Sequence, residues 1–482
     1  MIDYETLAEI ALTFATRHGT TYADVRFVQS EYENIEVTNG VPELIDNTFD
    51  SGMGIRVIAD GAWGFAATAD ATSEAIRETA IKAVEIAKAS AKLMKQPVEL
   101  ARAISFRGEY STPLTIDPFK IPLKEKLEYM TELCLLMTKA EGVAQASASM
   151  NFKRMFQYFA SSEGVMIRQN IIHSGAGIEC SAGKGHRGRS VRSYPNSSGG
   201  QFESKGYELI QELRLEENAP RIAQEAVALL SAKECPSGIK DIVLDGPMLS
   251  LQIHESIGHP LELDRVFGSE RNFSGTSYAT TEKLDKLKIG SELVNFVSDA
   301  TAFFGLGTFG YDDEGVKARK VDLIKNGILV GYESSRETAA RIGRESSGAA
   351  RADGWGNIPI IRMTNTNLLP GKDSLEDLIA GVDDGIYMAT VASWSIDDAR
   401  ESFTMGTEIG WEIKGGKLGE MIKSPSYSDE TIRFWNSCDG IGGPDLYRIW
   451  GTPNCGKGQP AQNGRVAQGC SPARFRGVKV GG

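Results

Sequence analysis

No apolar run in this sequence is long enough to cross a membrane, because none of its 482 residues belongs to a stretch that approaches roughly 18 consecutive apolar side chains. We also expect no signal peptide at the N-terminus. Residues 1–17 include Asp3, Glu5 and Glu9, and they lack the basic start and the apolar centre of such a leader. We therefore expect a cytoplasmic protein without a membrane partner.

Cysteine is scarce, and no part of the chain concentrates positive charge. The six cysteines are spread through 482 residues and form no disulfide framework, so in a reducing compartment each is a buried small side chain or a metal ligand. The formal net charge is −12. The densest basic run, residues 184–189, is a glycine-spaced loop that we interpret as a solvated turn or a substrate-facing loop. Nucleic acid is therefore not an expected partner.

Helical and hairpin patterns alternate in the first half of the chain. Apolar residues with helical spacing predict helices over residues 4–17, 74–94, 124–141 and 215–230. Alternating apolar positions predict strands over residues 23–29, 34–39, 54–59, 61–67, 144–152 and 154–161, with Asp60-Gly61 as a hairpin turn. Hairpins beside helices indicate an α+β fold rather than a doubly wound parallel sheet.

The second half is rich in glycine and in short strand patterns. Pro236-Ser237-Gly238 marks a predicted domain boundary. This boundary gives an N-terminal α+β domain of residues 1–235, with possible sub-regions 1–105 and 106–235, and a C-terminal domain of residues 236–482. Few helices are predicted in the C-terminal domain, so we expect a strand-rich barrel or sandwich there.

Histidine is rare, yet two of the five histidines flank Glu255 in the segment from His254 to Pro260. A His-Glu pair followed closely by His is typical of zinc peptidases, in which the imidazoles hold the metal and the glutamate is the general base. Here the histidines are five positions apart, which on a regular helix separates them by about 140°. We therefore expect the helix to end or bulge at Gly258, since glycine tolerates unusual dihedral angles and Pro260 pushes His259 out of the α region.

The residues before this motif predict the helix that carries it. Residues 239–244 have the pattern of a short apolar strand, and residues 245–247, Asp-Gly-Pro, have the capping carboxylate and early proline of a helix start. The alternative is that His254 and His259 are ordinary polar residues at a helix end. An apolar stripe of period four predicts that the helix is anchored in a core: Leu249, Ile253 and Ile257.

A catalytic zinc site needs three protein ligands, so one ligand must come from outside the motif. Cys455 stands in a polar loop of glycine and proline, where a buried structural thiol is least expected, and nearby Lys457 would favour the thiolate. The alternative is a solvent-accessible loop thiol. Glu262 and Asp264 could orient a ligating histidine or bind the metal themselves, or could form an ordinary solvated acidic pair.

Other catalytic patterns lack the context that they require. Residues 305–310 match a dinucleotide-binding fingerprint, but a polar turn follows them, and no helix N-terminus would receive a pyrophosphate. A tight turn or a close backbone approach is the better interpretation. No serine-hydrolase elbow and no Walker loop is present. Serine hydrolases and nucleotide enzymes therefore have little support.

Four segments together resemble the TldD/PmbA family of zinc metalloproteases: residues 254–264, 310–315, 362–366 and 454–459. The hairpin at residues 62–66 is similar to the N-terminal region of that family, so the resemblance covers nearly the whole chain. It is closer to the TldD branch, which keeps the metal motif, than to the PmbA (TldE) branch, which lacks it.

The resemblance implies a metallopeptidase of the HExxxH type that binds Zn²⁺ through His254, His259 and Cys455 and uses Glu255 as general base on the metal-activated water. It also implies an enclosed site that admits unfolded or short peptides, and a TldE/PmbA-like partner subunit, although a homodimer stays open. The alternatives are a zinc amidohydrolase that acts on a small non-peptide amide, and a non-catalytic metal-binding partner subunit.

Overall fold

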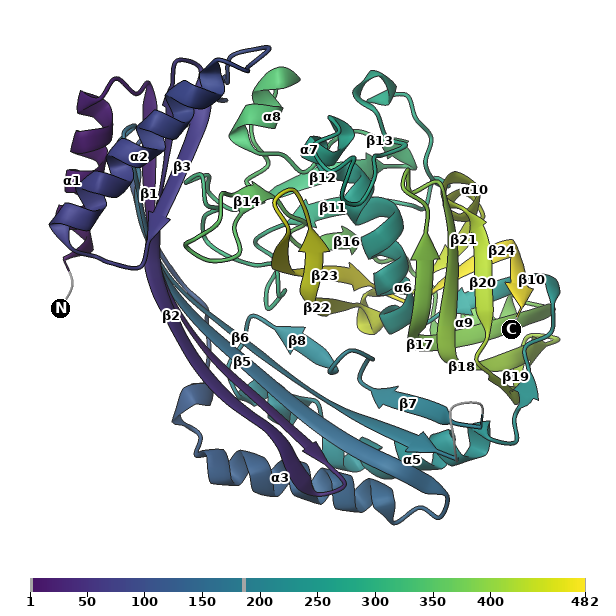
Figure 1. The fold of residues 1–482 in the computed structure, drawn as a ribbon. Helices are drawn as coiled ribbons and strands as arrows, with labels where there is room; N and C mark the ends of the chain where they lie inside the picture. The colour runs from purple at the N-terminus through teal and green to yellow at the C-terminus, as the bar shows by residue number, and fades with distance from the viewer. Residues whose placement is uncertain (1–2, 184–187, 482) are drawn as a thin grey trace.

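A long, curved sheet forms most of the first half of the protein (Figure 1). The computed structural model describes residues 3–183 and 188–481, so Met1, Ile2, Gly482 and residues 184–187 of the basic run lie outside the described residues. The strand order is β3-β2-β1-β5-β6-β4, and β7 and β8 pair along β6. The strands are β1 (Tyr22–Thr38), β2 (Val41–Ala59), β3 (Ala62–Thr68), β4 (Arg107–Ser111), β5 (Val143–Ser161), β6 (Met166–Ala182), β7 (Ser190–Tyr194) and β8 (Gln201–Glu203).

Two pairs of helices cover one face of this sheet. Helices α1 (Tyr4–Arg17) and α2 (Ser73–Ala91) pack at one end, and α3 (Leu123–Thr138) and α5 (Leu215–Leu229), preceded by the short α4 (Glu208–Glu212), pack at the other (Figure 1). Side chains alternate along a strand, so odd-numbered residues of β1 face both pairs: Ala23, Val25, Phe27, Ile35 and Val37. The even-numbered face is therefore available to the second half of the chain. Within residues 3–183 and 188–481, no helix is long and apolar enough to cross a membrane.

The predicted helices of this half are confirmed, with every end within three residues of its predicted position. The Asp60-Gly61 turn is also confirmed, because both residues have positive φ angles, 52° and 79°, as a type I′ turn requires. The predicted strands 23–29 and 34–39 are instead the two halves of β1. The polar residues between them stay extended because β2 pairs with one edge of β1 and β5 with the other.

Five strands close into a barrel in the second half of the chain, in the order β17-β10-β24-β20-β18, and β18 pairs back with β17. The strand-rich C-terminal region of an α+β protein is therefore confirmed. The barrel strands are β10 (Gly238–Leu244), β17 (Asp384–Ile396), β18 (Ser402–Lys414), β20 (Ser426–Glu430) and β24 (Ala473–Gly481). Strand β19 (Lys417–Lys423) pairs with β18, β21 (Cys438–Ile441) pairs with β24, and β9 (Lys233–Glu234) pairs with β19.

Smaller sheets and short helices complete this half. A four-stranded sheet has the order β13-β12-β11-β16, and two two-stranded ribbons, β14-β15 and β22-β23, lie outside it. These strands are β11 (Phe296–Asp299), β12 (Lys320–Lys325), β13 (Ile328–Leu329), β14 (Ala350–Arg351), β15 (Ile360–Ile361), β16 (Thr366–Leu368), β22 (Arg448–Lys457) and β23 (Gln462–Cys470). The helices are α6 (Gly246–Ile253), α7 (Leu263–Val266), α8 (Arg336–Arg341), α9 (Leu375–Ala380) and α10 (Thr431–Asn436).

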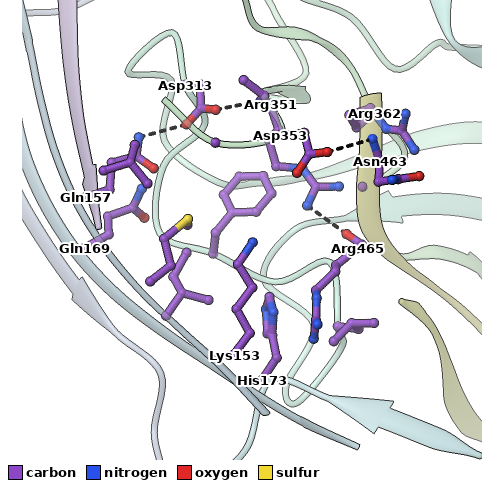
Figure 2. A pocket seen from close by; sticks show the side chains of 18 of the residues that line it. Lys153, Gln157, Gln169, His173, Asp313, Arg351, Asp353, Arg362, Asn463 and Arg465 are labelled. Carbon is purple, nitrogen blue, oxygen red and sulfur yellow. Dashed lines mark hydrogen bonds between the residues drawn. The ribbon is translucent and has the colours of Figure 1, made fainter. Parts of the chain in front are cut away.

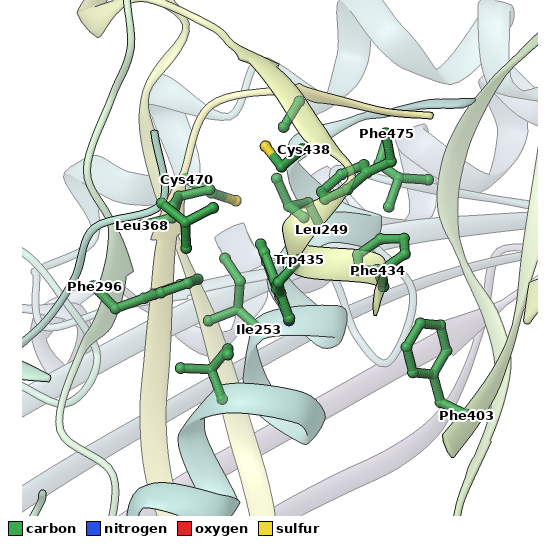
Figure 3. Close-up of a cluster of buried hydrophobic side chains, with 14 of the residues drawn as sticks. Leu249, Ile253, Phe296, Leu368, Phe403, Phe434, Trp435, Cys438, Cys470 and Phe475 are labelled. Atoms are coloured by element: carbon green, nitrogen blue, oxygen red, sulfur yellow. The ribbon is translucent and has the colours of Figure 1, made fainter. Parts of the chain in front are cut away.

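Helix α6 is anchored in the largest apolar core of the protein (Figure 3). The Asp245 side chain accepts a hydrogen bond of 2.9 Å from the Met248 N–H, which caps the helix where the sequence predicts its start. The predicted apolar stripe is confirmed, since its three residues are fully buried. Leu249 and Ile253 lie among the aromatic side chains shown with them in Figure 3: Phe296, Phe403, Phe434, Trp435 and Phe475. The rigid core therefore fixes the end of the helix from which the motif begins.

Buried ion pairs join the curved sheet to the C-terminal half. Arg26 on β1 pairs with Asp313 at 3.0 Å, and Arg56 on β2 pairs with Glu314 at 3.1 Å. Near the other end of the sheet, Arg192 pairs with Glu408. Removing one partner of such a pair leaves a buried charge uncompensated, so these pairs fix how the two halves meet. A division into domains at residue 236 stays a prediction.

Candidate metal centre

The predicted break in the motif helix is confirmed as a single π-helical turn. Helix α6 ends at Ile253, residues 254–258 form the π turn, and residues 259–261 form a short 3₁₀ turn. The His259 N–H donates to the His254 carbonyl, five residues back. In a π turn the residue at i+5 lies over residue i, as i+4 does in an α-helix. Both imidazoles therefore reach the same side of the helix despite their odd spacing.

Two details of the expected mechanism of this break were wrong. Gly258 has φ −58° and ψ −69°, and His259 has φ −56° and ψ −42°, so both residues stay in the right-handed helical region. Pro260 does not displace His259, because it stands in the first turn of the 3₁₀ segment, where proline is tolerated. Glycine is needed at 258 for space, since a Cβ there would lie 2.0 Å from the Met363 Sδ.

Cys455 is brought to the two histidines from a distant strand. Its Sγ lies 3.3 Å from the His254 Nε2 and 3.5 Å from the His259 Nε2. The residue was expected in a loop, but it belongs to β22, where it pairs with Gly464 of β23. Its side chain is only 3% exposed. The alternative of a solvent-accessible loop thiol is therefore wrong.

These three side chains fit a zinc ion in donor type and in spacing. Their donor atoms all lie within 4.8 Å of one another. Tetrahedral zinc with bonds of about 2.3 Å to sulfur and about 2.0 Å to nitrogen places these atoms about 3.5 Å apart, which agrees with the observed S···N distances. The buried His254 Nδ1 has no hydrogen-bond partner among the described residues. A set of three protein ligands leaves a coordination position open, as catalytic zinc sites do.

The cations that lower the pKa of the Cys455 thiol are not the one expected from the sequence. Burial raises the pKa of its thiol, but Arg362, His254 and His259 outweigh burial and lower that pKa well below its usual value. Arg362 donates a hydrogen bond of 2.5 Å to the Cys455 carbonyl. Lys457, expected to favour the thiolate, instead faces three carboxylates. The thiolate, which is the form that binds metal, is therefore favoured by Arg362 and the imidazoles.

Glu262 contacts the ring nitrogen of His259 that faces away from Cys455. One of its oxygens lies 2.8 Å from the His259 Nδ1, and it is fully buried. Burial raises the pKa of its carboxyl, but Lys457 and His259 outweigh burial and hold that pKa well below its usual range. Lys457 Nζ also pairs with Asp264 at 2.7 Å and with Glu270 at 3.5 Å. Glu262 and Asp264 are thus not a solvated acidic pair, and Glu262 leaves the His259 Nε2 to face Cys455.

Glu255 has a partner that sequence reasoning missed. Arg400 donates a hydrogen bond of 2.6 Å to the Glu255 Oε2, and both side chains are about nine-tenths buried. Burial raises the pKa of the Glu255 carboxyl, but His254, His259 and Arg400 outweigh burial and lower it. No local pattern around Arg400 signals this contact, because 145 positions separate the two residues. The carboxylate is therefore ionised and held beside the imidazoles.

The glycines at residues 305–310 serve close packing, as expected. A Cβ at Gly305 would lie 2.4 Å from the Asn365 Oδ1, and one at Gly307 would lie 2.2 Å from the Thr364 carbonyl. Asn365 accepts from the Gly307 N–H at 2.9 Å and donates to the Asp299 carbonyl at 2.7 Å. These glycines therefore pack against the segment that leads from Arg362, which donates to the Cys455 carbonyl.

Comparison with known proteins identifies related chains over the full length. Models of the PmbA/TldA metallopeptidase family match residues 23–87 (domain 1), 116–234 (central domain) and 237–482 (C-terminal domain). The chain is 30% identical to "Metalloprotease" of Methanothermobacter thermautotrophicus, over 100% of this chain and 99% of that protein. It is 23% identical to "Zinc metalloprotease TldD homolog" of Saccharolobus solfataricus, over 96% and 97%.

A solved structure shares the fold. TldE from Thermococcus kodakarensis superposes with a TM-score of 0.72 at 17% identity, over 98% of this chain and 99% of that chain. Because the identity is low, this similarity concerns the architecture alone. The relation extends over the curved sheet as well as the barrel.

Proposed function

Since the chain belongs to the PmbA/TldD metallopeptidase family, we propose that it is a zinc-dependent peptidase that hydrolyses unfolded or short peptides. The observation that supports this most directly is the convergence of His254, His259 and Cys455 from two distant segments, with donor atoms within 4.8 Å of one another. A zinc ion held there would polarise the scissile carbonyl and acidify a water molecule. The buried Glu255 carboxylate lies beside these ligands.

Glu255 acts as the general base and then as the general acid. Its lowered pKa keeps it ionised at neutral pH, so it can take a proton from the attacking water. Arg400 fixes one carboxylate oxygen through Oε2, and Oε1 accepts no hydrogen bond from the described residues. The proton then passes from Glu255 to the leaving amine, so no other acid is required for collapse of the tetrahedral adduct.

Three protein ligands favour catalysis over a purely structural metal. Structural zinc sites have four protein ligands, whereas the cluster in the described part of the chain has two histidines and one cysteine. A zinc amidohydrolase that acts on small amides would use the same groups. Cleavage of peptides compared with small acyl amides distinguishes these two activities.

We also propose that the protein pairs with a TldE/PmbA-like subunit or with a second copy. The first part of β2 has one unpaired edge, because β3 pairs only from Met53 to Ala59. Val41 and Phe49 on this part are 62% and 67% exposed, and Leu44 and Ile45 are also exposed. An exposed apolar edge strand is a typical site of protein association. Light scattering of the purified chain, alone and with a TldE-like protein, tests this pairing.

The cysteines support a cytoplasmic location. All six are free and buried, as expected for a protein folded in a reducing compartment. Fractionation of cells and detection of the native protein tests this assignment.

Zinc content and peptidase activity of matched variants test the proposed function. Glu255→Gln should keep zinc but lose activity by about 10²-fold or more, because it removes the general base. Cys455→Ala should lose zinc, whereas Cys470→Ala, a buried free thiol of the same region, should keep it. Wild-type turnover by Glu255→Gln would show that Glu255 is not the base. Equal zinc affinity of Cys455→Ala and wild type would exclude Cys455 as a ligand.

A further inference from the structure

A cavity of about 330 Å³ lies between the curved sheet and the C-terminal half (Figure 2), and Asn454, the neighbour of Cys455, is among its lining residues. Lys153 and His173 rise from β5 and β6 of the sheet, and Arg351 and Arg465 face them from the opposite wall. Arg362 also lines the cavity and donates to the carbonyl of Cys455. The cavity therefore adjoins the strand that carries a candidate metal ligand.

Positive charge is in excess in this cavity. Five basic residues line it against two acidic residues, Asp313 and Asp353. Arg26 is neutralised by Asp313 at 3.0 Å. The other four basic residues have no carboxylate within 4.0 Å in residues 3–183 and 188–481: Lys153, Arg351, Arg362 and Arg465. Like charges gathered in a largely buried space repel one another, which an anion in the cavity would offset.

Several donors in the cavity wall have no partner. Arg351 Nε, Arg362 Nε and Arg465 Nη1 are buried and form no hydrogen bond with the described residues. Neither ring nitrogen of His173 forms one. Burial lowers the pKa of Arg351 and of Arg465 to about 10, so both remain charged at neutral pH. A buried donor without a partner is destabilising, and the charge of these guanidinium groups acts on an anion in the cavity from within the wall.

We propose that this cavity binds a carboxylate of the peptide substrate, so that the enzyme prefers peptides that present a free carboxylate at this site. This inference rests on the proposed function. Guanidinium groups bind carboxylates through paired N–H donors, and a cavity of this size accommodates one or two residues. Met155, Ile171 and Phe309 provide apolar wall for the aliphatic part of the ligand. The carboxylate comes either from an Asp or Glu side chain or from the C-terminus of the peptide.

Binding is measured with zinc-loaded Glu255→Gln, which holds peptide without cleaving it. Three hexapeptides of otherwise identical sequence are titrated by calorimetry: a blocked peptide with one Glu, the same blocked peptide with Gln, and the Gln peptide with a free C-terminus. We expect the Glu peptide or the free C-terminus to bind at least about tenfold more tightly than the blocked Gln peptide. The peptide that binds more tightly than the blocked Gln peptide identifies the source of the carboxylate. Equal affinities, or no binding of either acidic peptide, overturn the proposal.

Variants of the wall test whether this preference arises in the cavity. Lys153 Nζ lies 5.0 Å from the Tyr32 ring centroid and has no ion pair in the described chain, so Lys153→Gln should fold and should bring the affinity ratio towards one. Arg465→Gln should do the same. Arg168→Gln is the matched control, because this cation also lies over a tyrosine of the sheet, Tyr158, but outside the cavity. An unchanged ratio in both wall variants overturns the proposal.

The two proposals fail in different ways. Cleavage of the blocked Gln peptide by wild type, together with equal affinities for acidic and neutral peptides, would leave the peptidase in place and reject the carboxylate site. If wild type carries zinc and cleaves no peptide, but the preference for acidic peptides persists in calorimetry and is lost in Lys153→Gln, the site stands and the proposed function does not.

Discussion

The Arg400 guanidinium donates a hydrogen bond of 2.6 Å to the Glu255 carboxylate, across 145 positions of the chain. Arg400 follows β17 and Glu255 lies in the π turn after α6, so the barrel strand and the motif helix meet at this contact. The pair orients a carboxylate that would otherwise be free to rotate beside the metal ligands. Arg400 is therefore a positioning residue for the proposed general base.

Arg400→Gln should lower kcat about 10- to 100-fold, the loss that corresponds to one hydrogen bond to a charged group. Zinc content should stay at the wild-type level, because Arg400 contacts no candidate ligand directly. Steady-state kinetics with metal analysis checks this. Arg433→Gln removes the ion pair between the half-exposed Arg433 and Asp429 nearby and should leave kcat unchanged, because neither residue contacts Glu255. A wild-type kcat in Arg400→Gln would show that Arg400 does not position the general base.

Glu262→Gln should weaken zinc binding about 10- to 100-fold, the range typical of removing a carboxylate that supports a metal-ligating histidine. Glu262 contacts the His259 Nδ1 at 2.8 Å. Asp264→Asn is the control, since Asp264 also pairs with Lys457 but makes no contact with His259. Competition with a chromogenic chelator measures both affinities. Equal losses in the two variants would indicate that the charge around Lys457 matters and the histidine contact does not.

Gly258→Ala should destabilise the protein by about 1–3 kcal/mol, because the added methyl group would overlap Met363 in a close-packed core. Zinc affinity should fall as well, since the π turn positions both histidines. Met363→Ala in the same chain should recover part of both losses. Gly356→Ala, where a Cβ meets nothing within 4 Å, is the control. Urea unfolding measures the free energy of unfolding. An unchanged value in Gly258→Ala would show that the turn has room for a side chain.

Asp245→Asn should change how stability depends on pH. Burial raises the pKa of Asp245 from 3.8 to about 7. The folded protein therefore keeps a proton that the unfolded chain releases above about pH 4, so this contribution to stability is full below that pH and is lost as the pH rises towards 7. Asn lacks this proton equilibrium, so the free energy of unfolding of wild type minus that of the variant should fall between pH 4 and 7.

Urea unfolding in a chelating buffer at several pH values gives this difference. Asp60→Asn, at an exposed turn position, controls for the loss of one carboxyl group. A difference between wild type and Asp245→Asn that stays constant from pH 4 to 7 would contradict the raised pKa.

The local conformation of the motif could be predicted from neighbouring residues. The cap at Asp245 and the apolar stripe that ends at Ile257 identify helix α6, and both are confirmed. The break after the helix also follows from the histidine spacing. The reason for glycine at 258 was less predictable, because it is the close contact with Met363, which is distant in sequence.

The sequence alone determined the elements, the class of fold and the family resemblance, because helix periodicity, caps and turns depend on residues a few positions apart. Only the tertiary structure decided which side chains meet. Cys455 reaches His254 across 201 positions and Arg400 reaches Glu255 across 145, since the β22-β23 ribbon and the closing of the barrel bring those segments to the π turn. Such contacts depend on the pairing of distant strands, and no local pattern encodes that pairing.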